Sequence, residues 1–151
     1  METNRYLKSK MYLYLSSDGS PVFNATNKWY DFRCTLHEPL QLDARLEWHV
    51  SILELYIQDK ISKNYDEDLI FFIKSDLADV SYVNLEKEPV LGDCRMKECF
   101  QSVKNFNSMF SVPVVRHDVH TVHIYISTSG GRLPALDQSA VTRITLSISS
   151  V

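Results

Sequence analysis

The fold class is decided by the stretch from residue 121 to residue 149, which reads TVHIYISTSGGRLPALDQSAVTRITLSIS. Apolar residues alternate with polar or aromatic ones in Thr121–Ser127 and again in Val141–Ser149. This alternation is typical of strands with one buried face, because successive side chains of a strand point to opposite sides. Between the two segments lies Ser129-Gly130-Gly131, where glycine supplies the positive φ angles that a turn requires. The stretch therefore predicts two strands separated by a turn.

Shorter segments of the same kind occur outward along the chain, each bounded by turn residues or charges. We expect strands at Lys10–Ser16, Asp31–Leu36, Asp68–Lys74 and Ser111–Arg116, and a less regular one at Val80–Leu85. Many short strands with turn signals every ~8–12 residues are typical of an antiparallel sandwich or barrel. The alternation of strands with helices that marks a parallel α/β fold is missing. The sequence therefore predicts an all-β protein.

Two longer segments fit either a helix or a strand. In Glu47–Ile57, apolar residues recur at steps of three and four, as they do on an amphipathic helix. The same segment alternates up to Ile52 and then alternates in the opposite phase, as a strand with a bulge near Ile52 would. Cys94–Phe106 carries a helical stripe of Met96, Cys99, Phe100, Val103 and Phe106. Periodicity alone leaves both segments open.

The composition limits the chain to few protein classes. It has 151 residues, of which 44% are hydrophobic, and this suits one domain with its own core. We expect a flexible lead-in over residues 1–9 and a single domain over residues 10–151. No apolar run approaches the ~18–20 residues of a membrane helix, and the N-terminus METNRY lacks the apolar core of a signal peptide. We therefore expect no membrane partner.

The charge balance and the cysteine content indicate whether the protein binds nucleic acid and in which cellular compartment it resides. The 16 Lys and Arg residues stand against 19 Asp and Glu residues, which gives a net charge of −3. Proteins that neutralise many phosphates usually carry a basic excess, so we expect no direct nucleic-acid binding. Cys34, Cys94 and Cys99 are an odd number at spacings that suit no disulfide framework, and they fit a reducing compartment.

The histidines at 117, 120 and 123 are the densest set of metal-ligating side chains. On a helix they would share one face and could bind a metal. Their apolar neighbours alternate as in a strand, on which His117 and His123 share a face and His120 points away. We therefore expect surface histidines and no metal site.

Three smaller groups also lack the pattern that catalysis or metal binding requires. Cys94 and Cys99 have four residues between them, more than the pairs of zinc or redox sites, so we expect buried thiols. Asp66–Asp68 lacks the alternating oxygen ligands and the glycine of a calcium loop. Glu47 and His49 could exchange a proton, but an exposed pair is the more frequent arrangement. With no Gly-x-Ser-x-Gly elbow and no glycine-rich phosphate loop, we expect no enzyme and no cofactor.

Eight segments follow one another in an order that is more specific than any one of them: Met11–Ser20, Asp31–Leu42, Glu47–Leu55, Asp68–Leu77, Pro89–Leu91, Asn105–Val114, Thr121–Gly131 and Val141–Ile148. They include PLQL at 39–42, EWHVSILEL at 47–55 and NFNSMFSVPV at 105–114. In this order, from about residue 10 to residue 149, the chain resembles the penton-like minor capsid proteins of Polinton (Maverick) transposons and adintoviruses.

The resemblance implies a single jelly-roll antiparallel β-sandwich of two four-stranded sheets, with Glu47–Ile57 a strand and Cys94–Phe100 largely extended. It implies a structural virion protein, a penton-type minor capsid subunit that forms a homopentamer at the icosahedral five-fold vertex. The implied partners are further copies of the chain and the major capsid protein. The implied location is the virion capsid, after assembly inside the host cell, in the nucleus. It assigns no catalytic, cofactor or metal residues, and the oligomer interface stays unknown.

Two other functions remain open on the residues alone. A lectin-like jelly-roll binding module would place Trp29 beside Asn27 and Asp31 at a concave surface, where the indole could stack on a sugar. A cupin-type enzyme would need histidines and carboxylates that converge inside the barrel. A buried Trp29 would count against the first of these functions, and protein without stoichiometric metal would count against the second.

Overall fold

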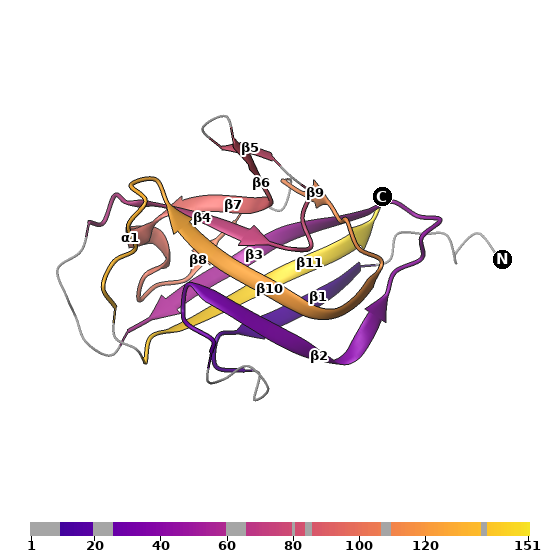
Figure 1. The fold of residues 1–151 in the computed structure, drawn as a ribbon, viewed down its shortest axis with the longest axis horizontal. Coiled ribbons are helices and arrows are strands. Elements are labelled where there is room, and N and C mark those ends of the chain that lie inside the picture. The colour runs from indigo at the N-terminus through magenta and orange to yellow at the C-terminus, as the bar shows by residue number, and fades with distance from the viewer. Residues whose placement is uncertain are drawn as a thin grey trace.

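The computed structural model describes residues 10–19, 26–59, 66–79, 81–83, 86–106, 110–136 and 139–151, with the backbone alone for 81–83 and 86–87. Strands dominate these residues (Figure 1), which confirms the all-β prediction. The lead-in predicted at 1–9 lies outside them and stays a prediction. Among the described residues, no helix is long and apolar enough to cross a membrane. The elements are β1 Lys10–Ser16, β2 Asp31–Gln41, β3 Trp48–Gln58, β4 Ile70–Ser75, β5 Ser81–Val83, β6 Glu86–Glu88, β7 Val90–Arg95, α1 Met96–Cys99, β8 Lys104–Asn105, β9 Val112–Pro113, β10 Asp118–Thr128 and β11 Val141–Ser150.

The strands pair in the nested pattern of a jelly roll. Sheet A has the order β1-β11-β3-β8, with β9 also paired to β3, and sheet B has the order β2-β10-β4-β7. The first strand thus pairs with the last and the second with the last but one, and these pairs are antiparallel. Sheet B has the four strands expected of it. In sheet A, the two short strands β8 and β9 share the fourth position, since both pair with β3.

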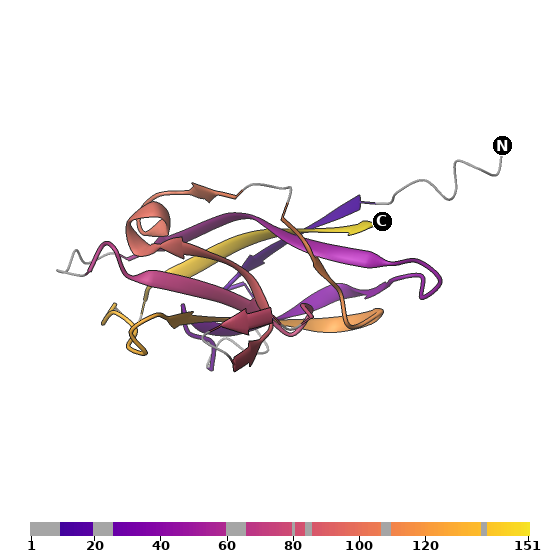
Figure 2. The ribbon, with the colours of Figure 1, turned by 90° about the horizontal axis from the view of Figure 1, so that it is seen from above.

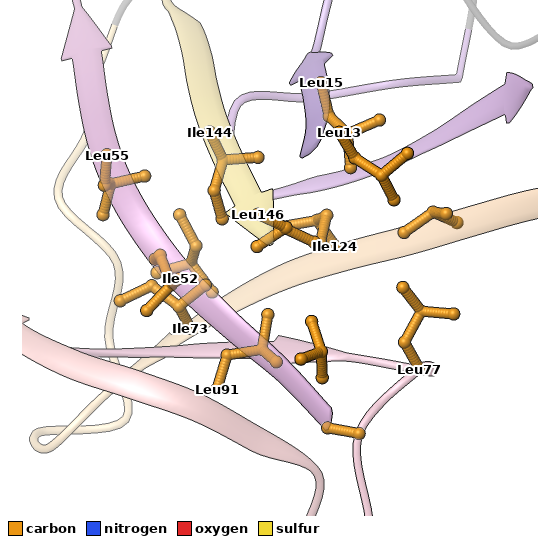
Figure 3. Close-up of a cluster of buried hydrophobic side chains, with 14 of the residues drawn as sticks. Leu13, Leu15, Ile52, Leu55, Ile73, Leu77, Leu91, Ile124, Ile144 and Leu146 are labelled. Carbon is orange, nitrogen blue, oxygen red and sulfur yellow. The ribbon is translucent and has the colours of Figure 1, made fainter. Parts of the chain in front are cut away.

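The two sheets pack face to face around one hydrophobic core. Figure 2 shows them as two layers, with β11 in one and β10 in the other. Figure 3 shows Leu13, Ile52, Ile73, Ile124 and Leu146 meeting between the layers from five different strands. Each such side chain contributes about 1.5–3 kcal/mol when it is fully buried. The alternation seen in the sequence is therefore the alternation between the core and the outside of the sandwich.

Strands with a clean alternation lie where the sequence predicts them. β1 has the predicted bounds, and β10 and β11 contain the segments that opened the sequence argument. The predicted strand at Asp31–Leu36 continues as β2 to Gln41. The strand predicted at Ser111–Arg116 is reduced to β9, beyond which the Val114 backbone N–H still donates to the Trp48 carbonyl oxygen of β3 at 2.8 Å.

The first ambiguous segment is a strand, β3, with a bulge. Along β11, Thr145 pairs with Glu54, and the next residue, Leu146, pairs with Ile52. Leu53 is skipped and is the extra residue of the bulge. The inward-facing positions change phase at this point, and this change of phase makes the sequence fit a helix equally well.

The expectation that Cys94–Phe100 is largely extended is wrong in part. Cys94 and Arg95 end β7, but Met96–Cys99 forms the one-turn helix α1. Glu98 accepts a hydrogen bond from the Arg95 backbone N–H at 2.9 Å, which closes the first turn. A single turn is unstable alone, so burial of Met96 and Cys99 in the core must hold it.

Candidate functional site

The predicted histidine cluster is divided between two separate ion pairs. His123 Nε2 lies 2.6 Å from Asp31 Oδ1 on the neighbouring strand, and the imidazole stacks on Tyr125. His120 Nε2 lies 3.2 Å from Asp118 Oδ1, and both of these side chains are exposed. His120 and His123 therefore each contact a different carboxylate and do not converge on one site.

Strict alternation fails along this part of β10. Val119 and Val122 are both buried, which leaves His120 and Thr121 together on the outer side. The register with β2 shifts at the same point. The expectation that His120 points away from His123 is therefore wrong, because the irregular pairing turns both toward the outside of the sandwich.

The acidic run Asp66–Asp68 forms a surface turn. The Asp66 carboxylate accepts the backbone N–H of Asp68 at 3.0 Å, and Lys97 Nζ lies 3.3 Å from Asp68 Oδ1. In the part of the chain that the structure describes, no three His, Cys, Asp or Glu side chains are grouped so that they could hold a metal ion.

Two cations on the side of sheet B are paired within the chain. Lys74 Nζ lies 3.0 Å from Glu88 Oε2, and the Lys74 side chain is 9% exposed. Arg116 lies 3.0 Å from Asp76, and the same carboxylate accepts the backbone N–H of His123. Both cations are thus paired with a carboxylate, although the buried Arg116 Nε has no hydrogen-bond partner among the described residues.

Glu47, His49 and Ser111 form a hydrogen-bonded chain of a carboxylate, an imidazole and a hydroxyl near the start of β3. His49 Nε2 lies 3.1 Å from Glu47 Oε1, and His49 Nδ1 lies 3.1 Å from Ser111 Oγ. The sequence suggested the first two residues but not Ser111, which reaches His49 because β9 pairs with β3. The Glu47 side chain is 66% exposed, where water weakens its effect on the imidazole. The trio lines neither of the hollows described below, whereas catalytic groups are usually found in a concave site.

The three cysteines are buried free thiols, as predicted. Burial raises the pKa of the Cys34 thiol. A hydrogen bond with Cys94, together with burial, raises the pKa of the Cys99 thiol. A raised pKa keeps a thiol protonated and therefore weakly nucleophilic, so these residues serve packing.

The lectin-like site expected around Trp29 is not formed. Trp29 is 5% exposed and packs against Tyr30 and Phe71, with ring centroids 5.3 Å and 6.0 Å away. The Asn27 amide exchanges two hydrogen bonds with the backbone of Arg33. An indole buried in this way cannot stack on a sugar, which argues against a binding surface at this place.

Exposed aromatic side chains gather instead on β1, at the free edge of sheet A. Tyr14 is 78% exposed and Tyr12 is 48% exposed. Lys10 Nζ lies 5.5 Å from the centre of the Tyr12 ring. These three residues occupy the outward positions of β1, while Leu13 and Leu15 enter the core. We call Lys10, Tyr12 and Tyr14 the edge-strand surface.

A shallow hollow of about 270 Å³ lies beside the edge-strand surface on the outer face of sheet A. It is lined mainly by carbon atoms, to which Tyr14, Tyr56 and Val103 contribute. Glu54 and Arg143 border it with opposite charges. The outer face of sheet A is therefore more apolar than the side of sheet B described above.

A second hollow, of about 200 Å³, lies at the opposite edge of the sandwich, between β7 and the segment that follows β8. Its lining residues are Ile52, Leu91, Gly92, Asp93, Phe106 and Phe110. The hollow depends on Gly92, because a Cβ atom there would lie 3.1 Å from Ile52 Cγ2 and 3.5 Å from the Phe106 ring. Asp93 is exposed and Phe110 is 61% exposed. We call this site the β7 hollow.

Sequence reasoning identified none of these surfaces as a site. For the edge-strand surface a signal exists, since Tyr12 and Tyr14 occupy the outward positions of a predicted strand. For the β7 hollow there is none, because Ile52, Gly92 and Phe106 come together only when β3, β7 and β8 are in place.

Comparison with known proteins shows a solved structure that is similar to this fold over nearly its whole length. The crystal structure of the mavirus penton protein matches 95% of this chain and 100% of its own chain, with a TM-score of 0.59 and 6% sequence identity. At this identity the likeness shows the fold, and the fold is a single jelly roll. The resemblance to penton-like proteins read from the sequence is confirmed at the level of the fold.

The other comparisons add no function. A crystal structure of an aminopeptidase from a marine sediment archaeon of the Thaumarchaeota matches 95% of this chain but 33% of its own, with 13% identity and a TM-score of 0.26, which is too low to carry an argument. No protein-family model matches the chain, and a search of curated proteins finds no match.

Proposed function

We propose that the chain is a penton-type minor capsid subunit that forms a homopentamer at the icosahedral five-fold vertex of a virion. The observation that carries the proposal is the correspondence with the mavirus penton protein, which includes nearly all of this chain and all of the other. The match is not confined to one part of the sandwich, since it extends over nearly all of the strands described above.

The surface chemistry supports an assembly role over a catalytic one. Lys74 and Arg116, on the side of sheet B, pair with carboxylates of the same chain, whereas the edge of sheet A exposes two tyrosines. Exposed apolar groups rimmed by polar residues are typical of protein interfaces. We therefore propose that the chain is not an enzyme, and that its partners are its own copies and the major capsid protein.

Location and nucleic-acid binding follow from the same proposal. The subunit would reside in the virion capsid after assembly inside the host cell, in the nucleus. We expect no direct contact with the genome, because acidic residues outnumber basic ones and the net charge is −3.

Native mass spectrometry of the purified chain over a range of concentrations tests the proposal. We expect a species of five copies, formed by the chain alone at high concentration or together with a co-expressed major capsid protein. Dilution is the control, because a specific oligomer dissociates in a single step toward monomer. A chain that stays monomeric at every concentration, and that also fails to join co-expressed major capsid protein, would refute the proposed function.

A further inference from the structure

Strand β1 is the outermost strand of sheet A. It pairs with β11 in an unbroken register of seven residues, and among the described residues no other strand pairs with its far side. Natural edge strands are usually protected by proline, by bulges or by charges, because a free edge can pair with another chain. β2 lies at the same flank, since Cys34 Sγ donates a hydrogen bond to the Ser16 carbonyl oxygen at the end of β1. β2 contains Pro39 and the register shift, whereas β1 has one charged residue, Lys10, at its start.

The opposite flank of the same sandwich is concave. β7 is the last strand of sheet B, and Phe106 directly follows β8, the last strand of sheet A. The β7 hollow lies between them, with Phe106 and Phe110 on its wall and Asp93 at its rim. Asp93 is exposed and forms no ion pair within the described residues, whereas Lys104 Nζ, which lies 5.7 Å from the centre of the Phe106 ring, is paired with Glu98. One flank of the chain therefore projects aromatic rings beside a lysine, and the other encloses an apolar space beside a carboxylate.

We propose that the edge-strand surface of one copy docks into the β7 hollow of a second copy of the same chain. The ring of Tyr14 or Tyr12 enters the hollow against Phe106 and Phe110, and Lys10 meets Asp93. The charges favour this occupant, because the base and the acid that would pair lie on opposite flanks of one chain. Two different surfaces of each copy make a heterologous contact, which closes into a ring when the rotation allows it.

This inference rests on the proposed function and deepens it by naming the two surfaces that meet in the pentamer. It differs from pairing of β1 with β1 of another copy, which would be isologous and would stop at two copies.

Single substitutions on each flank test the contact. Tyr14→Thr keeps strand propensity and removes the ring, and Asp93→Lys reverses the charge at the rim. Interface aromatics and paired charges usually carry much of the binding free energy, so each variant should need at least about 30-fold more protein for half-assembly, measured by native mass spectrometry. Val115→Thr is the matched control, because Val115 is 51% exposed and lies on neither surface. It should assemble like the unmodified chain.

Mixing the two defective variants distinguishes a heterologous contact between copies from other modes of association. The Tyr14→Thr copy keeps its hollow and the Asp93→Lys copy keeps its edge, so an equal mixture should form two-copy species that grow no further. A Lys10→Glu, Asp93→Lys double variant should recover assembly that each single variant loses, because the pair is restored with its charges exchanged.

The outcomes distinguish the inference from the function on which it rests. Five-copy assembly that survives both Tyr14→Thr and Asp93→Lys would overturn the docking contact and leave the pentamer intact. A mixture that stays monomeric would overturn it as well. If the unmodified chain alone never assembles, the contact is refuted as a self-sufficient interface, while co-assembly with the major capsid protein still tests the proposed function separately.

Discussion

Thr142 joins three separate parts of the chain, and its hydroxyl offers a sharp test of how β1 is held in place. Thr142 is fully buried on β11, and its Oγ1 donates a hydrogen bond of 2.6 Å to the Trp29 carbonyl oxygen. Its backbone N–H donates to Ser17 Oγ at 3.0 Å, and the Ser17 N–H donates to the Thr142 carbonyl oxygen at 2.9 Å. The Thr142→Val variant keeps the shape and the backbone bonds but removes the hydroxyl donor.

The expected loss follows from the carbonyl that is left without its donor. A buried acceptor without a partner costs about 1–3 kcal/mol, because folding still removes its water. The added methyl group of valine recovers only part of this loss. With a urea m-value of about 2 kcal/mol/M for a small domain, a loss of about 2 kcal/mol lowers the unfolding midpoint by about 1 M.

Urea unfolding followed by tryptophan fluorescence measures this loss, with Thr145→Val as the matched control. Thr145 lies three residues further along the same strand, half-buried on the outer face of sheet A. Its substitution should change the free energy of unfolding by no more than about 0.5 kcal/mol. Equal midpoint shifts for the two variants would refute the assigned role of the Thr142 hydroxyl. A changed m-value would show that the substitution acts on compactness rather than on one hydrogen bond.

Three further predictions concern the ion pair on α1, the thiols and the core. Glu98→Gln should cost about 0.5–1 kcal/mol at pH 7, because Glu98 lies 2.7 Å from Lys104 Nζ and both side chains are about a third exposed. Hydrogen bonding to Lys104 lowers the pKa of Glu98, so this stabilisation is lost as the pH falls through that pKa, and urea unfolding of both proteins should converge in acid. Cys99 should resist iodoacetamide in the folded protein and react after unfolding, because hydrogen bonding with Cys94 and burial raise the pKa of its thiol. Mass spectrometry measures the extent of labelling, and labelling of the native protein at the rate of the unfolded protein would contradict this prediction. Leu146→Ala should cost about 2–5 kcal/mol in denaturant unfolding, since Leu146 is fully buried between the sheets, and a loss below about 1 kcal/mol would be inconsistent with the packing described.

The sequence predicts those elements whose side chains alternate without interruption. β1 and β11 follow from their pattern alone, because buried and outward side chains alternate in one phase along all or nearly all of each strand. β3 does not, since the bulge at Leu53 reverses the phase and imitates a helical period. α1 is missed for the opposite reason: a helix of one turn has no period of its own, and its stability comes from Glu98 and from the core beneath it.

The candidate surfaces are less predictable than the strands, because they depend on which edges are left free. Tyr14 is visible in the sequence as an outward aromatic residue, yet only the sheet order shows that β1 is an edge. Gly92 reads as a weak point in a strand, and only its distance to Ile52 shows that its missing side chain opens a hollow. Such features arise from strands that are far apart in the chain.

The low identity with the mavirus penton protein is itself informative about which parts of the chain carry the function. A jelly-roll core tolerates many combinations of apolar side chains, provided that volume and alternation are kept, so strand order can persist at 6% identity. The outward positions obey no such rule and change with the partner. The shared fold therefore cannot transfer interface residues from one chain to the other. For this chain we propose strand β1 and the β7 hollow, and mixing Tyr14→Thr with Asp93→Lys copies tests those two surfaces directly.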